Sequence, residues 1–279
     1  MKKTAQSFDP RQVMHGTEFE IFHYRDPSPA DVAVHHHDFY EVYFFLEGEV
    51  EYWVEGRTYR LHPGDLMLIH PMQLHRPIIT PVKVYERFVL WIAKDYLETL
   101  SPGGGVLLAS FEGGRANILH PSPIQRTELS SRLGALVRES YSKEPGAALC
   151  AKGIFLQAMV DICRLSLRAA IPAKNKEDTP DLTAKVLSYI SEHFREELTL
   201  EQLGEHFFVS KYHLSHEFSR DTGISVYRFI LLKRLQAARQ LLISGKAPGE
   251  VYIECGFKDY SNFYRAFKAE YGTSPCKVY

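Results

Sequence analysis

The spacing of apolar residues changes along the chain, and this change limits the fold more than any other feature. Up to about Leu97 the apolar residues lie in short runs, rich in aromatic and β-branched side chains, that end at Gly, Pro or Asp. Examples are EVYFFLEG, EVEYWVEG, RTYRLHPGD and LMLIHP. Runs of this kind predict closely spaced strands in a sandwich or barrel. After Pro123 apolar residues recur three and four positions apart, which predicts helices. The predicted fold class is therefore α+β, with the strands first.

Breaks in this pattern divide the 279 residues into four segments. Residues 1–122 form the predicted β-domain, and residues 123–170 form two predicted helices that are broken near 144–146. Residues 171–181 are polar and contain two prolines, which is typical of a linker. Residues 182–279 have a helical pattern with short turns, which predicts an all-α domain.

The composition argues against several classes of protein. The sequence begins with two lysines but no apolar core behind them, so we expect no signal peptide. No window approaches the roughly 18 apolar residues that a membrane-spanning helix needs. None of the four cysteines lies in a C-x-x-C pair, so neither a zinc ribbon nor a disulfide framework is indicated. A reduced, cytoplasmic protein that does not enter a membrane is the simplest interpretation.

The net charge of −1 gives no global signal for nucleic acid. From Asp181 onward, 13 Lys and Arg stand against 12 Asp and Glu. If this segment binds DNA, its positive charge must be arranged on one face rather than be present in excess.

Two helix-turn-helix patterns follow one another in the C-terminal segment. In LTLEQLGEHFFVSKYHLSHEFSRDTG, Thr199 and Gln202 predict a capping box, Gly204 marks a close approach to another helix, and Ser210 predicts the start of a second helix. In PGEVYIECGFKDYSNFYRAFKAEYG, Asp259 predicts the corresponding start. In each second helix an i, i+4 pair of apolar residues is expected in the core; the pairs are Leu214 with Phe218 and Phe263 with Phe267.

A single long helix is predicted between the two patterns. No helix breaker occurs from Val226 to Ile243, which gives about 18 residues or roughly 27 Å of helix. Successive major grooves on one face of DNA are roughly 34 Å apart. A rigid helix of this length can therefore hold two recognition helices in adjacent grooves.

The polar faces of the two predicted recognition helices carry the candidate DNA contacts. Arg265 is the strongest candidate, because a bidentate Arg–guanine pair is the commonest specific contact. Lys211, Lys258 and Lys268 are expected to meet phosphates, which position the protein without reading sequence. The other candidates face the same way and are Tyr212, His213, Ser215, His216, Ser219, Ser261, Asn262 and Tyr264.

The stretch from Gly256 to Pro275, GFKDYSNFYRAFKAEYGTSP, resembles the hallmark of the AraC/XylS family of bacterial transcription regulators, G-F-x-D-x-S-x-F-x-R-x-F-K-x-x-x-G-x-S/T-P. The first pattern is similar to that family's TLxxLA…SxxxLSxxFxxxxG. The resemblance covers about 100 residues. It implies a regulator that binds a double-stranded DNA operator, most commonly an activator, with RNA polymerase as a partner.

Three consecutive histidines precede the strand run EVYFFLEG. If the strand is regular from His35 onward, His35, His37 and Glu41 share one face, and His36 points the other way. His75 follows Pro71 further along the chain. The aromatic residues nearby are core by default, although Tyr43 is also a candidate for lining an effector pocket.

These residues resemble the two cupin motifs, H-x-H-x-x-x-E-x-x-x-x-x-x-G and a P-G-D turn followed by P-x-x-x-H. His35, His37, Glu41 and His75 occupy the four positions that are metal ligands in metal-binding cupins. The resemblance implies a cupin-like barrel of the jelly-roll type. In that barrel these four residues and Tyr43 would bind an effector, or the four alone would hold a divalent transition metal.

Three functions are compatible with the whole pattern. The first is a regulator whose barrel senses a small molecule; members with such barrels often sense sugars, and residues 124–168 would couple the domains or form a homodimer. The second is a regulator that senses the metal itself. The third is a metal-dependent cupin enzyme with a DNA-binding tail, for which we find no additional acid or base with convincing placement. No catalytic residue is therefore predicted.

Overall fold

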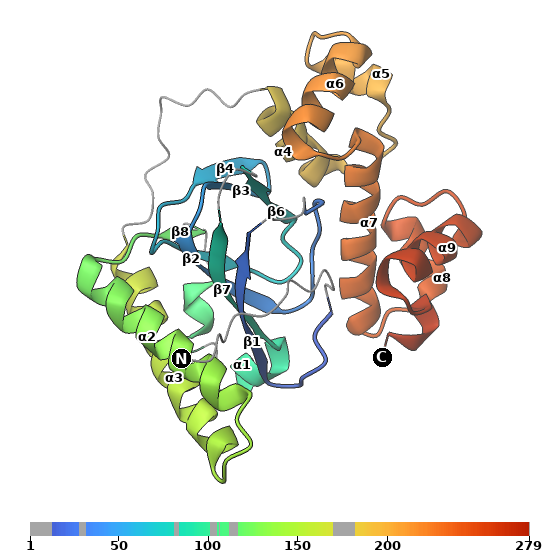
Figure 1. Ribbon diagram of the computed structural model, residues 1–279. Helices are drawn as coiled ribbons and strands as arrows, with labels where there is room; N and C mark the ends of the chain where they lie inside the picture. The colour runs from blue at the N-terminus through green and yellow to red at the C-terminus, as the bar shows by residue number, and fades with distance from the viewer. Residues whose placement is uncertain are drawn as a thin grey trace. The chain divides into compact units, whose positions relative to one another are not determined.

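The structure is a computed structural model, shown in Figure 1. It describes residues 13–27, 32–80, 84–100, 105, 107–111, 117–169 and 182–278. The chain divides into two compact units, Met1–Lys176 and Glu177–Tyr279. The predicted linker, 171–181, lies outside the described residues.

Two antiparallel sheets form the β-domain of the first unit. The larger sheet has the strand order β1-β7-β2-β5-β8, with β1 (Phe19–Asp26), β2 (Tyr40–Glu47), β5 (Leu66–Ile69), β7 (Tyr85–Ile92) and β8 (Ile118–Leu119). The smaller sheet has the order β4-β3-β6, with β3 (Val50–Val54), β4 (Arg57–Arg60) and β6 (His75–Ile79). The four predicted strand runs are therefore confirmed as β2, β3, β4 and β5.

The central strand β2 separates two cores because its side chains alternate between the faces of the sheet. Val42 and Phe44 face one core, which also contains buried residues of the helices. Tyr43 and Phe45 face the other, which lies between the two sheets and includes Tyr52 of β3. Nearly every residue of β2 is buried, as expected for a strand covered on both faces.

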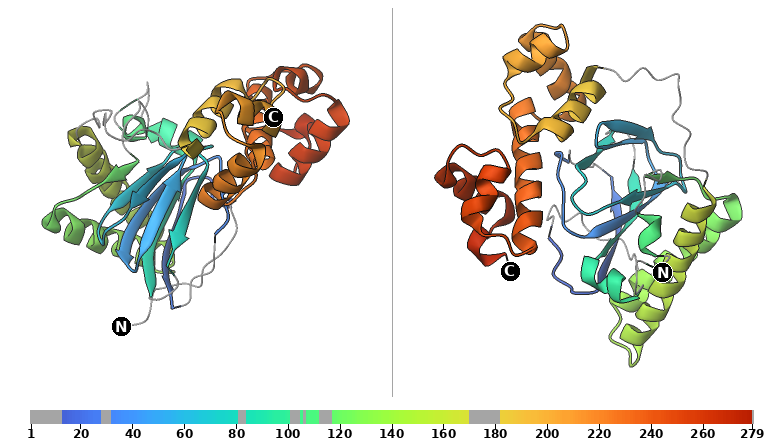
Figure 2. Two further views of the ribbon diagram at one scale, coloured as in Figure 1. Left: turned by 90° about the horizontal axis from the view of Figure 1, so that it is seen from above. Right: turned by 180° about the vertical axis from the view of Figure 1, so that it is seen from behind.

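Helices cover the outer face of the larger sheet (Figure 2). They are α1 (Lys94–Leu100), α2 (Pro123–Ser140) and α3 (Ala147–Arg168). Ser122 and Gln125 form a capping box at the start of α2. Phe155 of α3 stacks on Phe19 of β1, with ring centroids 4.4 Å apart. The two predicted helices and the break between them are confirmed, since α2 ends at Ser140 and α3 begins at Ala147.

The described part of the second unit is helical. Its α-helices are α4 (Leu182–His193), α5 (Leu200–His206), α6 (Lys211–Thr222), α7 (Val226–Ile243), α8 (Pro248–Glu254) and α9 (Tyr260–Tyr271). The capping box of Thr199 with Gln202 and the caps at Ser210 and Asp259 are confirmed. The long connecting helix has the predicted bounds. Both predicted core pairs are fully buried; they are Leu214 with Phe218 and Phe263 with Phe267.

The loop between α4 and α5 packs against both α7 and the second helix-turn-helix unit. Arg234 of α7 donates to the carbonyl oxygens of Phe194 and Glu196, at 2.7 Å each. Gly256 in the second turn has φ +81°, and a Cβ there would overlap the carbonyl of Arg195. The loop is therefore in close contact with both α7 and the second turn.

Among the described residues, no helix combines the length and apolar character required to cross a membrane.

Candidate nucleic-acid interface and sensor site

The first recognition helix, α6, presents its predicted polar face to solvent. Ser210 begins the helix by accepting a hydrogen bond from the His213 backbone N–H. Tyr212 is 78% exposed, which is unusual for a large aromatic side chain within a folded unit. The burial of the other candidates varies: His213 and His216 are exposed, whereas Lys211, Ser215 and Ser219 are half-buried.

In the second recognition helix, α9, Arg265 is part of a network of side-chain hydrogen bonds. The Asp259 carboxylate accepts from the side-chain amide of Asn262, and Oδ1 of the same side chain accepts from Nη2 of Arg265 at 2.5 Å. The guanidinium therefore lies at the exposed surface with its orientation partly fixed. The exposure of the remaining candidates differs: Ser261 and Lys268 are exposed, and Tyr264 is half-buried.

Two of the lysines that were expected to meet phosphates pair with carboxylates. Lys211 Nζ lies 2.6 Å from Glu201 Oε1, and Lys258 Nζ lies 2.5 Å from Glu197 Oε1. DNA phosphates would have to compete with these carboxylates. Because exposed ion pairs are weak, that competition costs little.

The candidate sensor site lies between the two sheets and is centred on the carboxylate of Glu41. Trp91 Nε1 donates to one oxygen of Glu41 at 2.9 Å, and the hydroxyl of Tyr52 donates to the other at 3.1 Å. Trp91 stands directly opposite Glu41 in the β2–β7 register. Sequence reasoning missed both donors, because their placement depends on strand pairing that a local pattern does not reveal.

Each of three histidine rings is oriented by a hydrogen bond to the backbone carbonyl of a residue two positions away. The Nδ1 atoms of His35, His37 and His75 lie 2.8 to 2.9 Å from the carbonyl oxygens of Ala33, Phe39 and Gln73. A neutral ring that donates through Nδ1 leaves a lone pair on Nε2, and metal-ligating histidines are commonly held in this way. The buried Nε2 of His75 has no hydrogen-bond partner within the described part of the chain.

His37 and Glu41 approach each other closely. His37 Nε2 lies 3.3 Å from Glu41 Oε2, while His37 Nδ1 faces the Phe39 carbonyl. If Nδ1 carries the only proton, two lone pairs face each other. A positive charge is therefore needed between Nε2 and the carboxylate, and either a proton or a metal ion can supply it.

Three of the four residues in the predicted ligand set converge. One ligand atom each from His37, Glu41 and His75 lies within 4.8 Å of the others. Two imidazole nitrogens and a carboxylate oxygen suit a divalent transition metal. His35 is not in this group, although its ring centroid is 4.3 Å from that of His75.

The predicted alternation of the histidines along a regular strand is wrong. β2 begins at Tyr40, and His35 forms only an isolated bridge with His75. The chain bends at Asp38 and Phe39, so His37 meets Glu41 across a bend rather than along a strand. His36 is also buried. Alternation fails here because it requires continuous extended backbone.

Burial strongly affects ionisation in this site. Burial lowers the pKa of His35 to about 4 and that of His75 well below its ordinary value. Burial also disfavours the charged form of Glu41, but hydrogen bonding to His37 and the attraction of the histidines outweigh it and lower the pKa of Glu41 to about 2. The site therefore combines the neutral imidazoles of His35 and His75 with the ionised carboxylate of Glu41.

Two tyrosines, Tyr43 and Tyr85, add further polar groups to the core between the sheets. Tyr43, the predicted effector contact, is buried, and its hydroxyl contacts that of Tyr85. Burial raises the pKa of Tyr85 to about 12, so its hydroxyl stays protonated. Arg87 stacks over the ring of Tyr85 and pairs with Asp26. The space between the sheets thus offers hydroxyl, carboxylate and imidazole groups among aromatic rings, as small-molecule sites commonly do.

Two recognition helices on one connecting helix, together with a separate sheet-rich domain that encloses polar groups, define a DNA-binding regulator with its own ligand-binding domain. Known proteins agree with this class. The family model for the AraC-like ligand-binding domain matches residues 18–159, and that for a helix-turn-helix domain matches residues 203–278. The chain belongs to the AraC family of transcriptional regulators, and it is a regulator rather than an enzyme.

Individual relatives are distant. The transcriptional activator RhaS of Salmonella schwarzengrund (strain CVM19633) is 25% identical over 249 residues, which cover 86% of this chain and 85% of RhaS. The uncharacterized regulator YbfI of Bacillus subtilis (strain 168) is 24% identical over 232 residues, which cover 82% of this chain and 80% of YbfI. A solved C-terminal domain of AraT, a response regulator from Geobacillus stearothermophilus, is 30% identical with a TM-score of 0.34, and the match covers 35% of this chain and 83% of that one.

Proposed function

We propose that the protein is a cytoplasmic, ligand-responsive activator that binds a double-stranded DNA operator through α6 and α9 and contacts RNA polymerase. The observation that carries the proposal is the pair of capped recognition helices, whose exposed polar faces are linked by one unbroken helix. The effector would bind between the sheets, near Glu41 and Tyr43. It can shift the DNA-binding state only by its different affinity for the two states.

Footprinting on the chromosomal region around the gene tests the DNA-binding part of this proposal. We expect protection of two half-sites about one helical turn apart, because each recognition helix enters its own major groove. Protection of a single short site, or none, would contradict the two-helix arrangement.

We propose a small hydroxylated molecule, such as a carbohydrate, as the effector. The tyrosine hydroxyls, the carboxylate of Glu41 and the ring of Trp91 support this chemistry, because they offer hydrogen bonds beside an aromatic face. Titration with a panel of sugars, read by tryptophan fluorescence, tests it. The Glu41→Gln variant should lose the response, and a saturable response that survives this variant would place the effector elsewhere.

A metal-sensing regulator is the second candidate. The 3.3 Å approach of His37 Nε2 to Glu41 Oε2, together with the unpartnered Nε2 of His75, supports it. A bound ion would supply positive charge and open coordination positions for a ligand. Elemental analysis of protein purified without a nickel column should find about one equivalent of metal. A content well below that after reconstitution would exclude this candidate.

We also propose that α3 forms a homodimer with a second copy of the chain. Leu149, Leu156, Val160 and Leu167 are exposed and lie seven, four and seven positions apart, which is compatible with the a and d positions of a heptad. Charged substitutions at Leu156 and Val160 should give monomers in sedimentation velocity, and Gln157→Glu on the same helix is the control. A wild-type protein that is monomeric at micromolar concentration, with and without effector, would contradict the dimer.

A further inference from the structure

We propose that the protein takes up protons at His213 and His216 when α6 binds its half-site, so that this half of the operator alone is bound more tightly at lower pH. The inference rests on the proposed function, namely that α6 and α9 each enter a major groove. It adds a condition under which the two half-sites contribute unequally to binding.

The two recognition helices carry different side chains at equivalent positions. Six residues after its N-cap, α6 has His216 where α9 has Arg265, and three residues further it has Ser219 where α9 has Lys268. Neither Arg265 nor Lys268 pairs with a carboxylate among the residues that the structure describes, and α9 contains no histidine. Because Arg and Lys stay charged at physiological pH, α9 presents a fixed positive charge to DNA.

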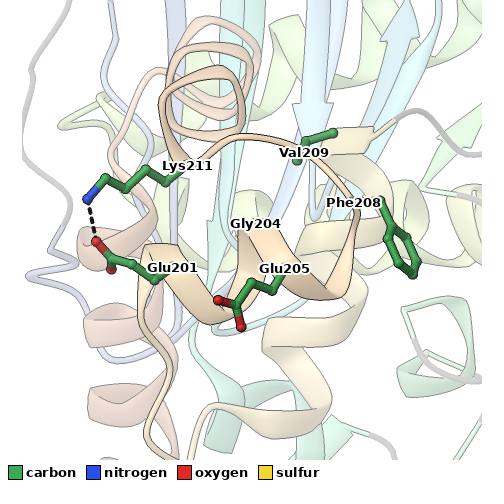
Figure 3. Close-up of a pocket in the computed structure, with 6 residues that line it drawn as sticks. All are labelled: Glu201, Gly204, Glu205, Phe208, Val209 and Lys211. Atoms are coloured by element: carbon green, nitrogen blue, oxygen red, sulfur yellow. Dashed lines mark hydrogen bonds and ion pairs between the residues drawn. The ribbon is translucent and has the colours of Figure 1, made fainter.

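The fixed charges of α6, by contrast, offset one another. Lys211 pairs with Glu201 of α5 at 2.6 Å (Figure 3). Arg220 donates to both carboxylate oxygens of Glu217, at 2.6 Å each, and to Asp221 at 2.8 Å. Even when Lys211 turns to a phosphate, these carboxylates stay close by. The helix therefore offers DNA no net fixed positive charge.

Two histidines are the remaining basic groups of α6, and both are exposed. His213 and His216 lie three positions apart, which makes them neighbours on the helix surface. Nδ1 of His216 lies 3.7 Å from Oε1 of Glu217. Histidine is the side chain that ordinarily gains or loses its charge between pH 5 and 8. The charge that α6 presents to DNA therefore changes with pH, whereas that of α9 does not.

The helices packed against α6 are α4, α5 and α7, and within the described part of the chain none of them forms an ion pair with either ring. α5 contributes the carboxylates of Glu201 and Glu205 beside the start of α6 (Figure 3). α4 contacts α6 through the Thr183 hydroxyl, and α7 through the Phe229 ring. Like the carboxylate of Glu217, DNA phosphates favour the protonated form of a nearby imidazole. Binding of DNA therefore draws protons onto the two rings.

Affinity of the full chain for the footprinted operator, measured by fluorescence anisotropy from pH 6 to 8 at constant ionic strength, tests the proposal. We expect it to rise by roughly tenfold as the pH falls over this range, since each proton taken up contributes up to about tenfold per pH unit. A shortened duplex without the α6 half-site should lose this dependence, and one without the α9 half-site should keep it. Arg265→Ala identifies the α9 half-site, because it should relax base preference there alone.

Three variants separate the two rings from other titrating groups. The double variant His213→Gln, His216→Gln should abolish the rise in affinity at low pH, whereas His216→Arg should bind tightly even at pH 8. His206→Gln changes an exposed histidine of α5 and is the matched control, which should keep the wild-type dependence. A double variant with unchanged pH dependence, or a dependence that follows the α9 half-site, would overturn the proposal. A wild type that binds no operator at any pH would instead refute the proposed function.

Discussion

Arg265 illustrates how a single side chain on α9 is prepared for recognition. Its Nη2 donates to the side-chain Oδ1 of Asn262, and the Nδ2 of that side chain donates to the carboxylate of the N-cap residue Asp259. The residue that starts the helix thus also sets the direction of the arginine. Some of the conformational entropy that a long side chain loses on binding is therefore already lost in the free protein.

Arg265→Ala should cost about 1–3 kcal/mol of operator affinity and relax base preference at one position of a half-site. Selection from operators randomised at each position measures this preference. Lys268→Ala is the contrasting variant: it should weaken all sequences about equally and reduce the salt dependence. If Arg265→Ala kept the wild-type preference and affinity, Arg265 would be only a surface residue.

Gly256→Ala should destabilise the second unit by clearly more than the roughly 1 kcal/mol expected for Ala at positive φ. The additional loss arises because the new Cβ would overlap the backbone of Arg195. Gly245→Ala is the matched control, since Gly245 has φ +89° and nothing within 4 Å of the added Cβ. Urea unfolding followed by circular dichroism compares the two, and equal losses would contradict the close contact.

At the residue scale, the helix caps could be predicted from the sequence, whereas the relative positions of the buried histidines could not. The caps at Thr199, Ser210 and Asp259 were predictable because capping depends on neighbours within three or four residues. The position of His35 relative to His37, Glu41 and His75 was not, because it follows from a bend at Asp38 and a single bridge to His75. Local periodicity contains no information about either.

At the scale of elements, the bounds of α7 were predictable because they depend on breakers and caps close to its ends. The contact of the α4–α5 loop with α7 was not, since Arg234 reads in the sequence as one more polar residue on a helix. In the structure it satisfies two backbone carbonyls of that loop. This contact fixes the first helix-turn-helix unit to the helix that carries the second.

Arg234→Gln should weaken binding to an operator with both half-sites and should also make binding less sensitive to their spacing. The reason is that a loosened joint lets the two recognition helices adjust independently. Anisotropy titrations with operators lengthened by one base pair measure the effect. Gln240→Ala, an exposed change on the same helix, should keep the wild-type spacing dependence. An Arg234 variant with unchanged spacing dependence would show that other contacts fix the joint.

At the scale of the whole molecule, both tryptophans belong to the first unit. Trp53 and Trp91 are both buried, and the sequence contains no others. Tryptophan fluorescence therefore follows the unfolding of the first unit alone. The order of the strand-rich and helical segments was predictable from the change in the spacing of apolar residues. Which residues surround Glu41 was not predictable, because it depends on pairing between strands that are distant in the sequence.

The first unit should lose stability as the pH falls from 7 to 5 in the presence of a chelator. Burial holds the pKa of His35 at about 4. Between that value and the ordinary histidine pKa of about 6.5, the unfolded chain binds a proton that the folded chain does not. The loss from His35 alone is on the order of 2 kcal/mol.

Urea unfolding followed by tryptophan fluorescence at pH 5, 6 and 7 measures this loss. The His35→Gln variant should reduce the dependence by the share that His35 contributes, while a remainder persists because burial also lowers the pKa of His75. A wild-type midpoint that stays constant over this range would mean that His35 is as easily protonated in the folded state as in the unfolded chain.

The connecting helix α7 also constrains how this gene can change over evolutionary time. One inserted residue would rotate α9 by about 100° relative to α6 and shift it by about 1.5 Å, so the two helices could no longer enter one face of the same DNA. Substitutions on the exposed surface of α7 do not change the rotation of α9 relative to α6. We therefore expect orthologous genes to accumulate point substitutions across these codons while keeping their number constant, and to vary in length at loops instead.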